Sequence, residues 1–147
     1  MRSADTNLFI YAADPDSPHH EASLDFFMSV NTAKSDFLLC ELILVELYMQ
    51  LRNPAIFATP YSPTEAAGYC SKLKACPYWR CVDYSHEISR KIWHWAERDN
   101  GSFRRIIDAR IALTLRHHGV TEFATANVKD FKNMGFQKVW NPLKESI

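Results

Sequence analysis

The sequence predicts an α/β fold in which a short central parallel sheet of four to five strands lies between helices, in three layers. Short apolar runs alternate with helical segments of about 10 to 15 residues, as in successive strand–helix–strand crossovers. Glycine and proline number only 4 and 7 in 147 residues, which is typical of a globular chain. At this length we expect one domain that spans residues 1–147.

The opening part of the chain predicts a strand, two helices and a second strand. A short strand ends near Asp5, and a helical turn over 7–13 ends at the Pro-containing segment 14–18. Apolar residues at helical spacing predict an amphipathic helix over 19–30. Residues 37–40 form the short apolar run expected of a buried parallel strand.

The middle of the chain predicts two helices and a third strand. Residues 41–52 are apolar almost all round, which predicts a heavily buried helix that ends where Pro54 disfavours its continuation. The Ser-Pro-Thr-Glu sequence at 62–65 has the pattern of a capping box and begins a helix that runs through Leu73. A third strand is expected over 79–84.

The last part predicts two further helices and two strands. Residues 85–99 carry apolar side chains along one side of a helix, and 103–118 form another that ends at Gly119, a residue suited to a left-handed cap. Residues 122–125 predict a fourth strand. Residues 138–140 predict a possible fifth, which is short and lies at an edge of the sheet.

Composition excludes several classes of protein. The 17 basic and 17 acidic residues leave no net charge, so any contact with nucleic acid must be local. The four cysteines contain no CxxC pair and are not spaced against the six histidines as zinc ligands, so we expect reduced, partly buried thiols. The amino terminus shows no charged leader with a long apolar run, so we expect a cytoplasmic protein that does not span a membrane.

Four acidic residues are candidates for chemistry because three stand where a carboxylate is costly without a cationic partner and the fourth follows a strand. Asp5 ends the first strand, where ligand sites of open α/β sheets form. Glu46 lies in the most apolar helix. Asp108 shares a helix face with apolar residues, whereas Arg105 and Arg116 are expected to point towards water. The fourth acid, after the predicted fourth strand, is Asp130.

Each acid also has a purely structural explanation. Asp5 could cap the helix that follows it, and Glu46 could form a buried salt bridge or lie at a solvent-facing edge. Asp108 could be stabilised by the dipole of its helix. Asp130 could form a capping box with Asn127. Taken together, however, the four acids can converge at one edge of a parallel sheet, and clustered carboxylates have a common rationale in a hard cation such as Mg²⁺ or Mn²⁺.

Four sequence segments occur in order over essentially the whole chain: Asp5-Thr6-Asn7, Leu44-Val45-Glu46-Leu47 before Asn53-Pro54, Ile107-Asp108-Ala109-Arg110-Ile111-Ala112, and Thr125-Ala126-Asn127-Val128-Lys129-Asp130-Phe131. This ordered set resembles the signature segments of PIN-domain ribonucleases. Residues 14–20 and the closing Trp140-Asn141-Pro142-Leu143 further resemble a subgroup of VapC-type toxins from bacterial toxin–antitoxin pairs.

The resemblance implies a PIN-like fold and an endoribonuclease whose Mg²⁺ or Mn²⁺ activates water, leaving a 5′-phosphate and a 3′-hydroxyl. The implied metal ligands are Asp5, Glu46, Asp108 and Asp130, and the implied supporting residues are Thr6, Asn7 and Thr125. Many relatives carry Asp at the position of Asn127, so we expect only an outer role for this residue. The resemblance also implies a homodimer and a small VapB-like antitoxin that blocks the site and binds operator DNA, so that DNA contact is indirect.

Two other classes of function compete with this interpretation. A catalytically inactive binding module would keep the fold and the partner, although it would be expected to have lost an acid. A phosphatase or receiver domain is disfavoured because the first strand ends in Asp5-Thr6-Asn7 and not in a DxD pair.

Some weaker features remain open. Arg104, Arg105, Lys129 and Lys132 could receive an RNA backbone or could be solvated helix ends. For Trp79, Trp93 and Trp95, core or dimer packing is favoured over base stacking or contact with an antitoxin.

Overall fold

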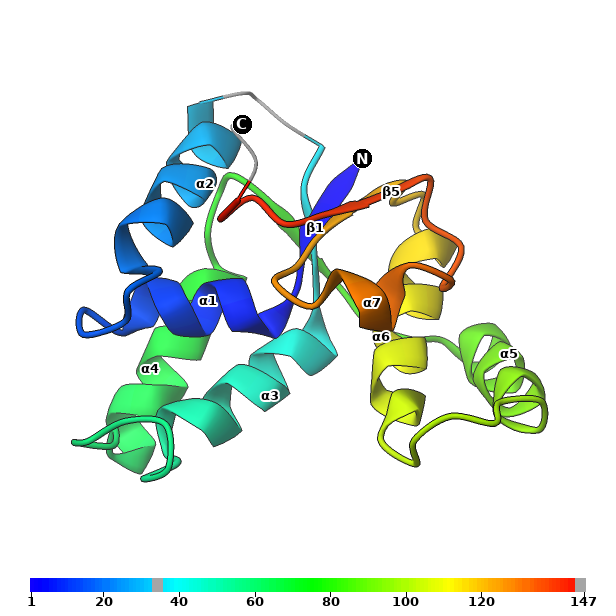
Figure 1. The fold of residues 1–147 in the computed structure, drawn as a ribbon, viewed down its shortest axis with the longest axis horizontal. Helices are drawn as coiled ribbons and strands as arrows, with labels where there is room; N and C mark the ends of the chain where they lie inside the picture. The colour runs from blue at the N-terminus through cyan, green and yellow to red at the C-terminus, as the bar shows by residue number, and fades with distance from the viewer. Residues whose placement is uncertain (33–35, 145–147) are drawn as a thin grey trace.

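The computed structural model describes residues 1–32 and 36–144, and within them five short strands run parallel to one another (Figure 1). Their bounds are β1 (Arg2–Ala4), β2 (Leu38–Cys40), β3 (Arg80–Val82), β4 (Glu122–Ala124) and β5 (Lys138–Trp140). β1 pairs with β4 and β4 with β5, while β2 pairs with β3. These strands form a three-stranded sheet in the order β1-β4-β5 and a two-stranded sheet of β2 and β3, and a parallel bridge between Arg2 and Phe37 connects the two. As predicted, β5 is an edge strand.

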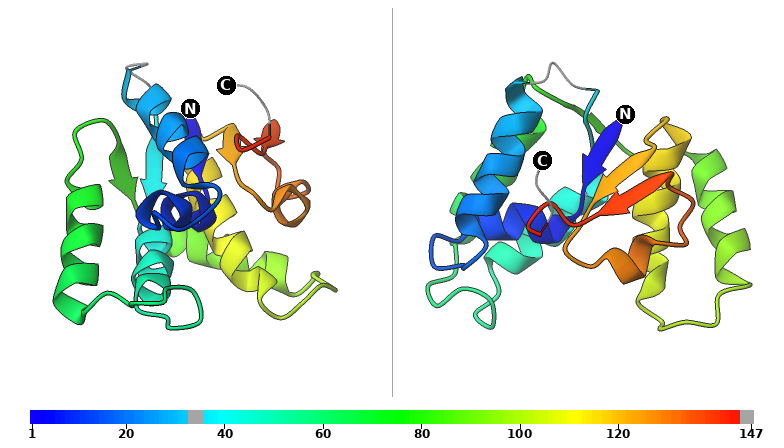
Figure 2. Two further views of the ribbon diagram at one scale, coloured as in Figure 1. Left: turned by 60° about the vertical axis from the view of Figure 1, so that its left-hand side comes forward. Right: turned by 45° about the horizontal axis from the view of Figure 1, so that its top comes forward.

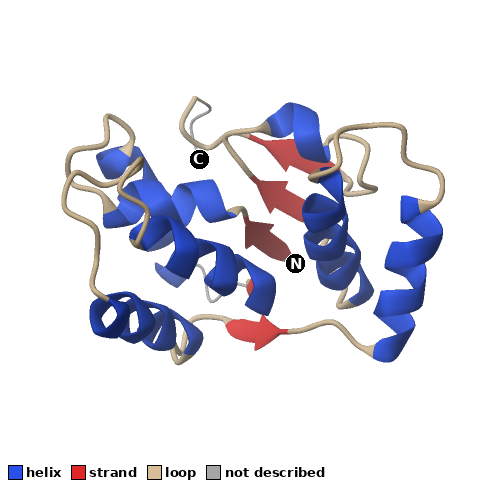
Figure 3. Ribbon diagram, turned by 90° about the horizontal axis from the view of Figure 1, so that it is seen from below, coloured by secondary structure: helices blue, strands red, loops and turns tan. Residues whose placement is uncertain are grey.

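Helices cover both sides of these strands, which confirms the predicted three-layer α/β arrangement (Figures 2 and 3). Their bounds are α1 (Thr6–Ala13), α2 (His20–Thr32), α3 (Glu41–Leu51), α4 (Pro63–Lys74), α5 (His86–Ala96), α6 (Arg105–His117) and α7 (Val128–Phe131). α1 to α4 form one group and α5 and α6 pack together on the other side. Each predicted element is present; α5 is shorter at its end than expected, and the one-turn helix α7 is additional.

Local signals in the sequence determine several helix ends. The predicted capping box is formed, because the Ser62 hydroxyl accepts from the Glu65 N–H at 3.1 Å and the Glu65 carboxylate accepts from the Ser62 N–H at 2.9 Å. Gly119, at φ 90°, ends α6 in the left-handed conformation that glycine adopts readily.

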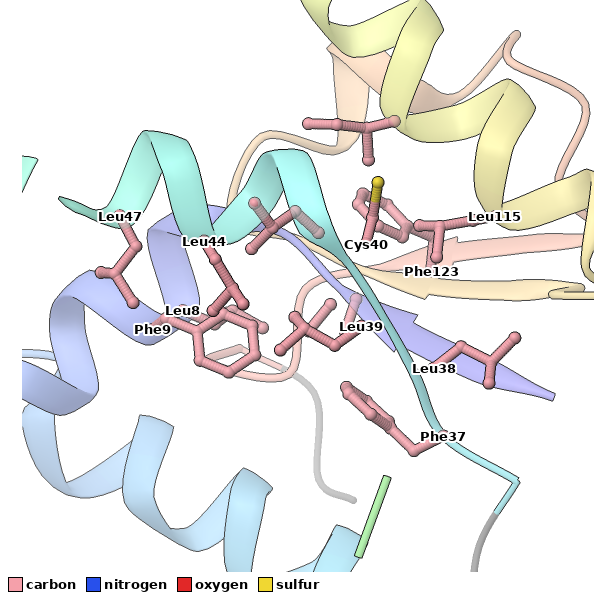
Figure 4. Close-up of a cluster of buried hydrophobic side chains, with 14 of the residues drawn as sticks. Leu8, Phe9, Phe37, Leu38, Leu39, Cys40, Leu44, Leu47, Leu115 and Phe123 are labelled. Atoms are coloured by element: carbon pink, nitrogen blue, oxygen red, sulfur yellow. The ribbon is translucent and has the colours of Figure 1, made fainter. Parts of the chain in front are cut away.

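The core lies where the strands meet both helix layers (Figure 4). Leu39 of β2 and Leu8 of α1 are fully buried, and Phe123 of β4 stacks on Phe136 with ring centroids 4.9 Å apart. The prediction for α3 is wrong in one respect. Its Val45 and Met49 side chains are 48% and 61% exposed, because α3 packs through one face only, against α1 and α4.

Cysteines and tryptophans follow the expectations in part. All four cysteines are free thiols, and burial raises the pKa of Cys40 to about 11, which keeps that thiol protonated. Trp79 packs against the rings of the core, whereas Trp93 is 64% exposed and takes no part in it.

None of the helices in the described part of the chain combines the length and apolar character needed to cross a membrane.

Candidate active site

The carboxyl ends of β1 and β4 lie side by side and bring distant polar residues together. Asp5 directly follows β1, and its backbone N–H donates to the Ala124 carbonyl of β4 at 2.9 Å. Thr125 directly follows β4 and is fully buried. Parallel pairing of these two strands therefore places Asp5 and Thr125, 120 residues apart in sequence, at the same edge of the sheet.

Both oxygens of the Asp5 carboxylate accept hydrogen bonds. Oδ1 accepts from the Thr6 N–H at 2.7 Å, which is the helix cap considered from the sequence. Oδ2 accepts from the Thr125 hydroxyl at 2.6 Å and from the Asn7 amide at 2.8 Å. The capping explanation therefore accounts for one oxygen, while the other is held by side chains from two separate segments.

Asn7 and Thr125 also fix the loop that leads from β4 to α7. The Asn7 amide oxygen accepts from the Ala126 N–H at 3.3 Å, and its NH₂ group also contacts the Thr125 hydroxyl at 3.2 Å. The same hydroxyl accepts from the Asn127 N–H at 2.9 Å. The loop preceding Asp130 is thus attached to the end of β1 by a small hydrogen-bond network.

Glu46 joins this network from α3. The Thr6 hydroxyl donates to Glu46 Oε2 at 2.7 Å, and burial raises the pKa of Glu46. The salt-bridge explanation is wrong, since the ion pairs among residues 1–32 and 36–144 do not include this side chain. Glu41 on the same helix is different, because Lys74 lies 3.0 Å from it and lowers its pKa.

Asp108 lies in the first turn of α6, where the helix dipole favours a negative charge. Its pKa is nevertheless raised to about 6, chiefly by burial and then by the nearby charges of Asp130 and Glu46, against a lowering effect of Arg105. Dipole stabilisation alone would lower the pKa. Burial and the neighbouring acids therefore outweigh any stabilisation of the Asp108 charge by the helix dipole.

Asp130 lies on α7 with an exposed side chain, within electrostatic reach of Asp108. The capping-box explanation is wrong, because Asn127 at the start of α7 makes no side-chain capping hydrogen bond. Asn127 and Asp130 line a cavity of about 590 Å³. Asn141 and Lys144 also line it, and neither was predicted as a site residue, although Asn141 belongs to the closing Trp140-Asn141-Pro142-Leu143 segment.

The expectation that Arg105 points towards water is also wrong, whereas Arg116 is exposed as expected. Arg105 Nε donates to Asp99 Oδ1 at 3.1 Å and is partly buried. Arg116 donates to the Met134 carbonyl at 3.3 Å. Arg105 is consequently the cation that acts on Asp108, a relationship that the three-residue spacing on one helix makes possible.

The acids form a concentration of negative charge that suits a hard cation. Burial, with smaller contributions from the charges of Glu46 and Asp108, raises the pKa of Asp5 to about 7 against the lowering effect of its hydrogen bonds. Carboxylate and hydroxyl oxygens are the donors that Mg²⁺ and Mn²⁺ prefer. The chemistry of the donor set therefore fits such an ion. In the part of the chain that is described, no three acidic, histidine or cysteine side chains lie close enough together to bind one metal ion.

Comparison with known proteins agrees with this architecture. The PIN domain family model matches residues 4–137. Ribonuclease VapC24 from two strains of Mycobacterium tuberculosis, CDC 1551 / Oshkosh and ATCC 25618 / H37Rv, is 40% identical over 143 residues, covering 97% of this chain and 97% of the relative.

Solved structures show the same fold at low identity. M. tuberculosis VapC20, described as a sarcin–ricin loop cleaving toxin, has a TM-score of 0.65 at 13% identity, covering 84% of this chain and 87% of its own. FitAcB from Neisseria gonorrhoeae has a TM-score of 0.67 at 19% identity, covering 99% and 100%. FitAB bound to a DNA fragment gives 0.68 at 16% identity, covering 100% and 99%. With the match over nearly its whole length, the chain belongs to the PIN domain family and to its VapC-type members.

Proposed function

We propose that this protein is a VapC-type toxin, an endoribonuclease that hydrolyses RNA with Mg²⁺ or Mn²⁺ held by Asp5, Glu46, Asp108 and Asp130. The observation that carries the proposal is the hydrogen-bonded Asp5 carboxylate at the end of β1, with Glu46 and Asp108 close enough to raise its pKa. Ribonuclease VapC24, at 40% identity, supports the reaction class.

The chain contributes oriented oxygens and a fixed loop. Thr125, Asn7 and Thr6 hold the Asp5 and Glu46 carboxylates in place, which reduces the rearrangement that binding requires. When bound, the divalent ion would orient water for in-line attack and neutralise charge on the scissile phosphate. Because the pKa of Asp5 is about 7, this carboxyl is partly protonated at neutral pH and must release its proton to act as a ligand.

A catalytically inactive binding module of the same fold is the alternative, and the site disfavours it. A module that had lost catalysis would not need to keep four acids where two of them have a pKa of about 6 to 7. Charges that disfavour folding in this way are retained at functional sites.

We further propose a small VapB-like antitoxin as the partner, a homodimer as the toxin's own state, and the cytoplasm as its location. A locally anionic site in a neutral chain can be blocked by an Arg or Lys side chain from a partner. Contact with DNA would then run through the antitoxin.

Growth of bacteria that express the protein without a partner tests this function. We expect slow growth with the wild-type chain and relief by Asp5→Asn, with Asp25→Asn, an exposed position on α2, as the control that stays toxic. Unchanged toxicity of Asp5→Asn, at equal protein level, would contradict the assignment of Asp5.

A further inference from the structure

A second cavity, of about 360 Å³, lies between α5 and α6 on the face that carries Arg105. It is lined by Lys91, His94, Trp95, Arg98, Asp99 and Leu113. Trp95 is only partly buried, and with Leu113 it gives the cavity an apolar, aromatic side. The volume is within the range of small-ligand sites and is large enough for a nucleobase.

The rest of the lining contains two cations, Lys91 and Arg98, and Arg98 forms no ion pair among the residues that the structure describes. Lys91, His94 and Arg98 all have exposed side chains at its rim. The one acid, Asp99, is already paired with Arg105 at 3.1 Å. Residues 84–117, which include both helices, carry seven Lys or Arg and four Asp or Glu, a net charge of +3 in a chain whose total is zero. This part of the chain therefore has a surplus of basic residues.

Arg105 connects this cavity to the carboxylates. Its guanidinium lies 5.7 Å from the centroid of the Trp95 ring and is held by Asp99. The same side chain acts electrostatically on Asp108. Arg105 thus contacts Trp95 of the cavity and acts on Asp108 of the proposed catalytic site, which places the two sites on either side of one side chain.

We propose that this cavity binds a nucleotide of the RNA substrate next to the cleavage site, with its base against Trp95 and its phosphates beside Lys91 and Arg98. An aromatic ring flanked by cations is the chemistry with which proteins bind single-stranded RNA without strong sequence preference. The proposal rests on the ribonuclease function above and adds to it the site that holds the substrate strand.

α5 itself supplies matched controls. Arg90 is next to Lys91 and is exposed, and Trp93 is two positions from Trp95, yet neither Arg90 nor Trp93 lines the cavity. Lys91 forms only an exposed ion pair with Glu87, at 2.9 Å, so its removal should leave the fold intact.

The test is the affinity of the full-length protein for a short, unstructured, fluorescein-labelled RNA, measured in EDTA over a range of salt concentrations so that cleavage does not interfere. Lys91→Ala and Arg98→Ala should each weaken binding and reduce the slope of log K against log salt by about 0.7. Trp95→Leu should weaken binding roughly fivefold or more, and Trp95→Phe should restore much of it. Arg90→Ala and Trp93→Leu should keep wild-type affinity and slope.

Melting curves identify any variant that fails to fold, and if Trp95→Leu is one of them, the exposed Lys91→Ala/Arg98→Ala pair decides. Loss of binding in that double variant supports the proposal. If the double variant binds RNA as tightly as Arg90→Ala does, the proposal is overturned. It is also overturned if the double variant changes only self-association or antitoxin capture, because the cavity would then be a protein contact. Cleavage of the same RNA by the wild-type protein with Mg²⁺ is measured separately. If RNA binding depends on Lys91 and Arg98 but the wild-type protein cleaves no RNA, the proposed binding cavity is supported and the proposed ribonuclease activity is refuted.

Discussion

The Thr125 hydroxyl donates a hydrogen bond of 2.6 Å to Asp5 Oδ2, so the first residue of the β4–α7 loop orients the acid at the end of β1. Both side chains are buried, and the bond lowers the pKa of Asp5 against the larger raising effect of burial. A neutral hydroxyl thereby favours the charged form of the carboxylate that is proposed to hold the ion.

Thr125→Val should reduce ribonuclease activity by about 10- to 100-fold while the protein stays folded, because Asp5 loses the donor that orients it and favours its charge. Thr114→Val is the matched control. Thr114 is also fully buried, but its hydroxyl has no hydrogen-bond partner in the described part of the chain, so valine should be neutral or stabilising there. Cleavage rates and melting curves of both variants provide the check, and equal activity of the two would show that the Thr125 bond has no role.

Glu46→Gln should abolish most cleavage, on the order of 100-fold or more, because the amide lacks the charge proposed to bind the ion. Glu41→Gln on the same helix should keep activity. Its charge is paired with Lys74 and its substitution should cost only a little stability. Rates measured at saturating Mg²⁺ compare the two, and an active Glu46→Gln protein would remove Glu46 from the site.

Asp108→Asn should stabilise the metal-free protein near neutral pH. The folded pKa of Asp108, about 6, lies above the ordinary 3.8, mainly because burial disfavours its charge. The resulting penalty is absent below pH 3.8, accumulates as pH rises towards 6, and is complete above it. Discounted for partial exposure, the gain is about 1 kcal/mol, or roughly 2–4 °C in melting temperature.

Melting curves with and without Mg²⁺ at two pH values test this expectation. The gain of Asp108→Asn should disappear in acid, and the variant should lose the Mg²⁺-induced rise in melting temperature together with nuclease activity. A variant that melts lower than wild type without metal, yet responds normally to Mg²⁺, would show that Asp108 serves as a helix cap.

A small antitoxin should accompany the protein when both are expressed from the native host, with an Arg or Lys inserted near the acids. Purification of the tagged toxin followed by mass spectrometry detects such a partner. Recovery of the toxin only as a free homodimer under native expression would count against it.

The sequence predicted the order of elements well because apolar periodicity and caps are local. It also singled out Asp5, Asp108 and the edge of the sheet where strands end. The bond between Asp5 and Thr125 depends on strand pairing across 120 residues, and no local pattern contains it.

Exposure and pairing on helix surfaces were predicted less well. The apolar α3 appeared buried all round, but Val45 and Met49 are exposed because only one face meets other helices. Arg105 appeared solvated, but the turn before α6 places Asp99 against it. Both outcomes depend on which elements lie next to one another, which periodicity alone does not specify.

Cleavage of total RNA by the purified protein, with Mg²⁺ or Mn²⁺ and with EDTA, tests the central claim most directly. Wild-type protein should cut looped or single-stranded RNA at defined positions with either ion and not in EDTA, and Asp5→Asn should be inactive in all conditions. Because Asp5 must lose a proton at a pKa of about 7, activity at limiting Mg²⁺ should rise with pH through this value. Full activity in EDTA, or in Asp5→Asn, would contradict the account.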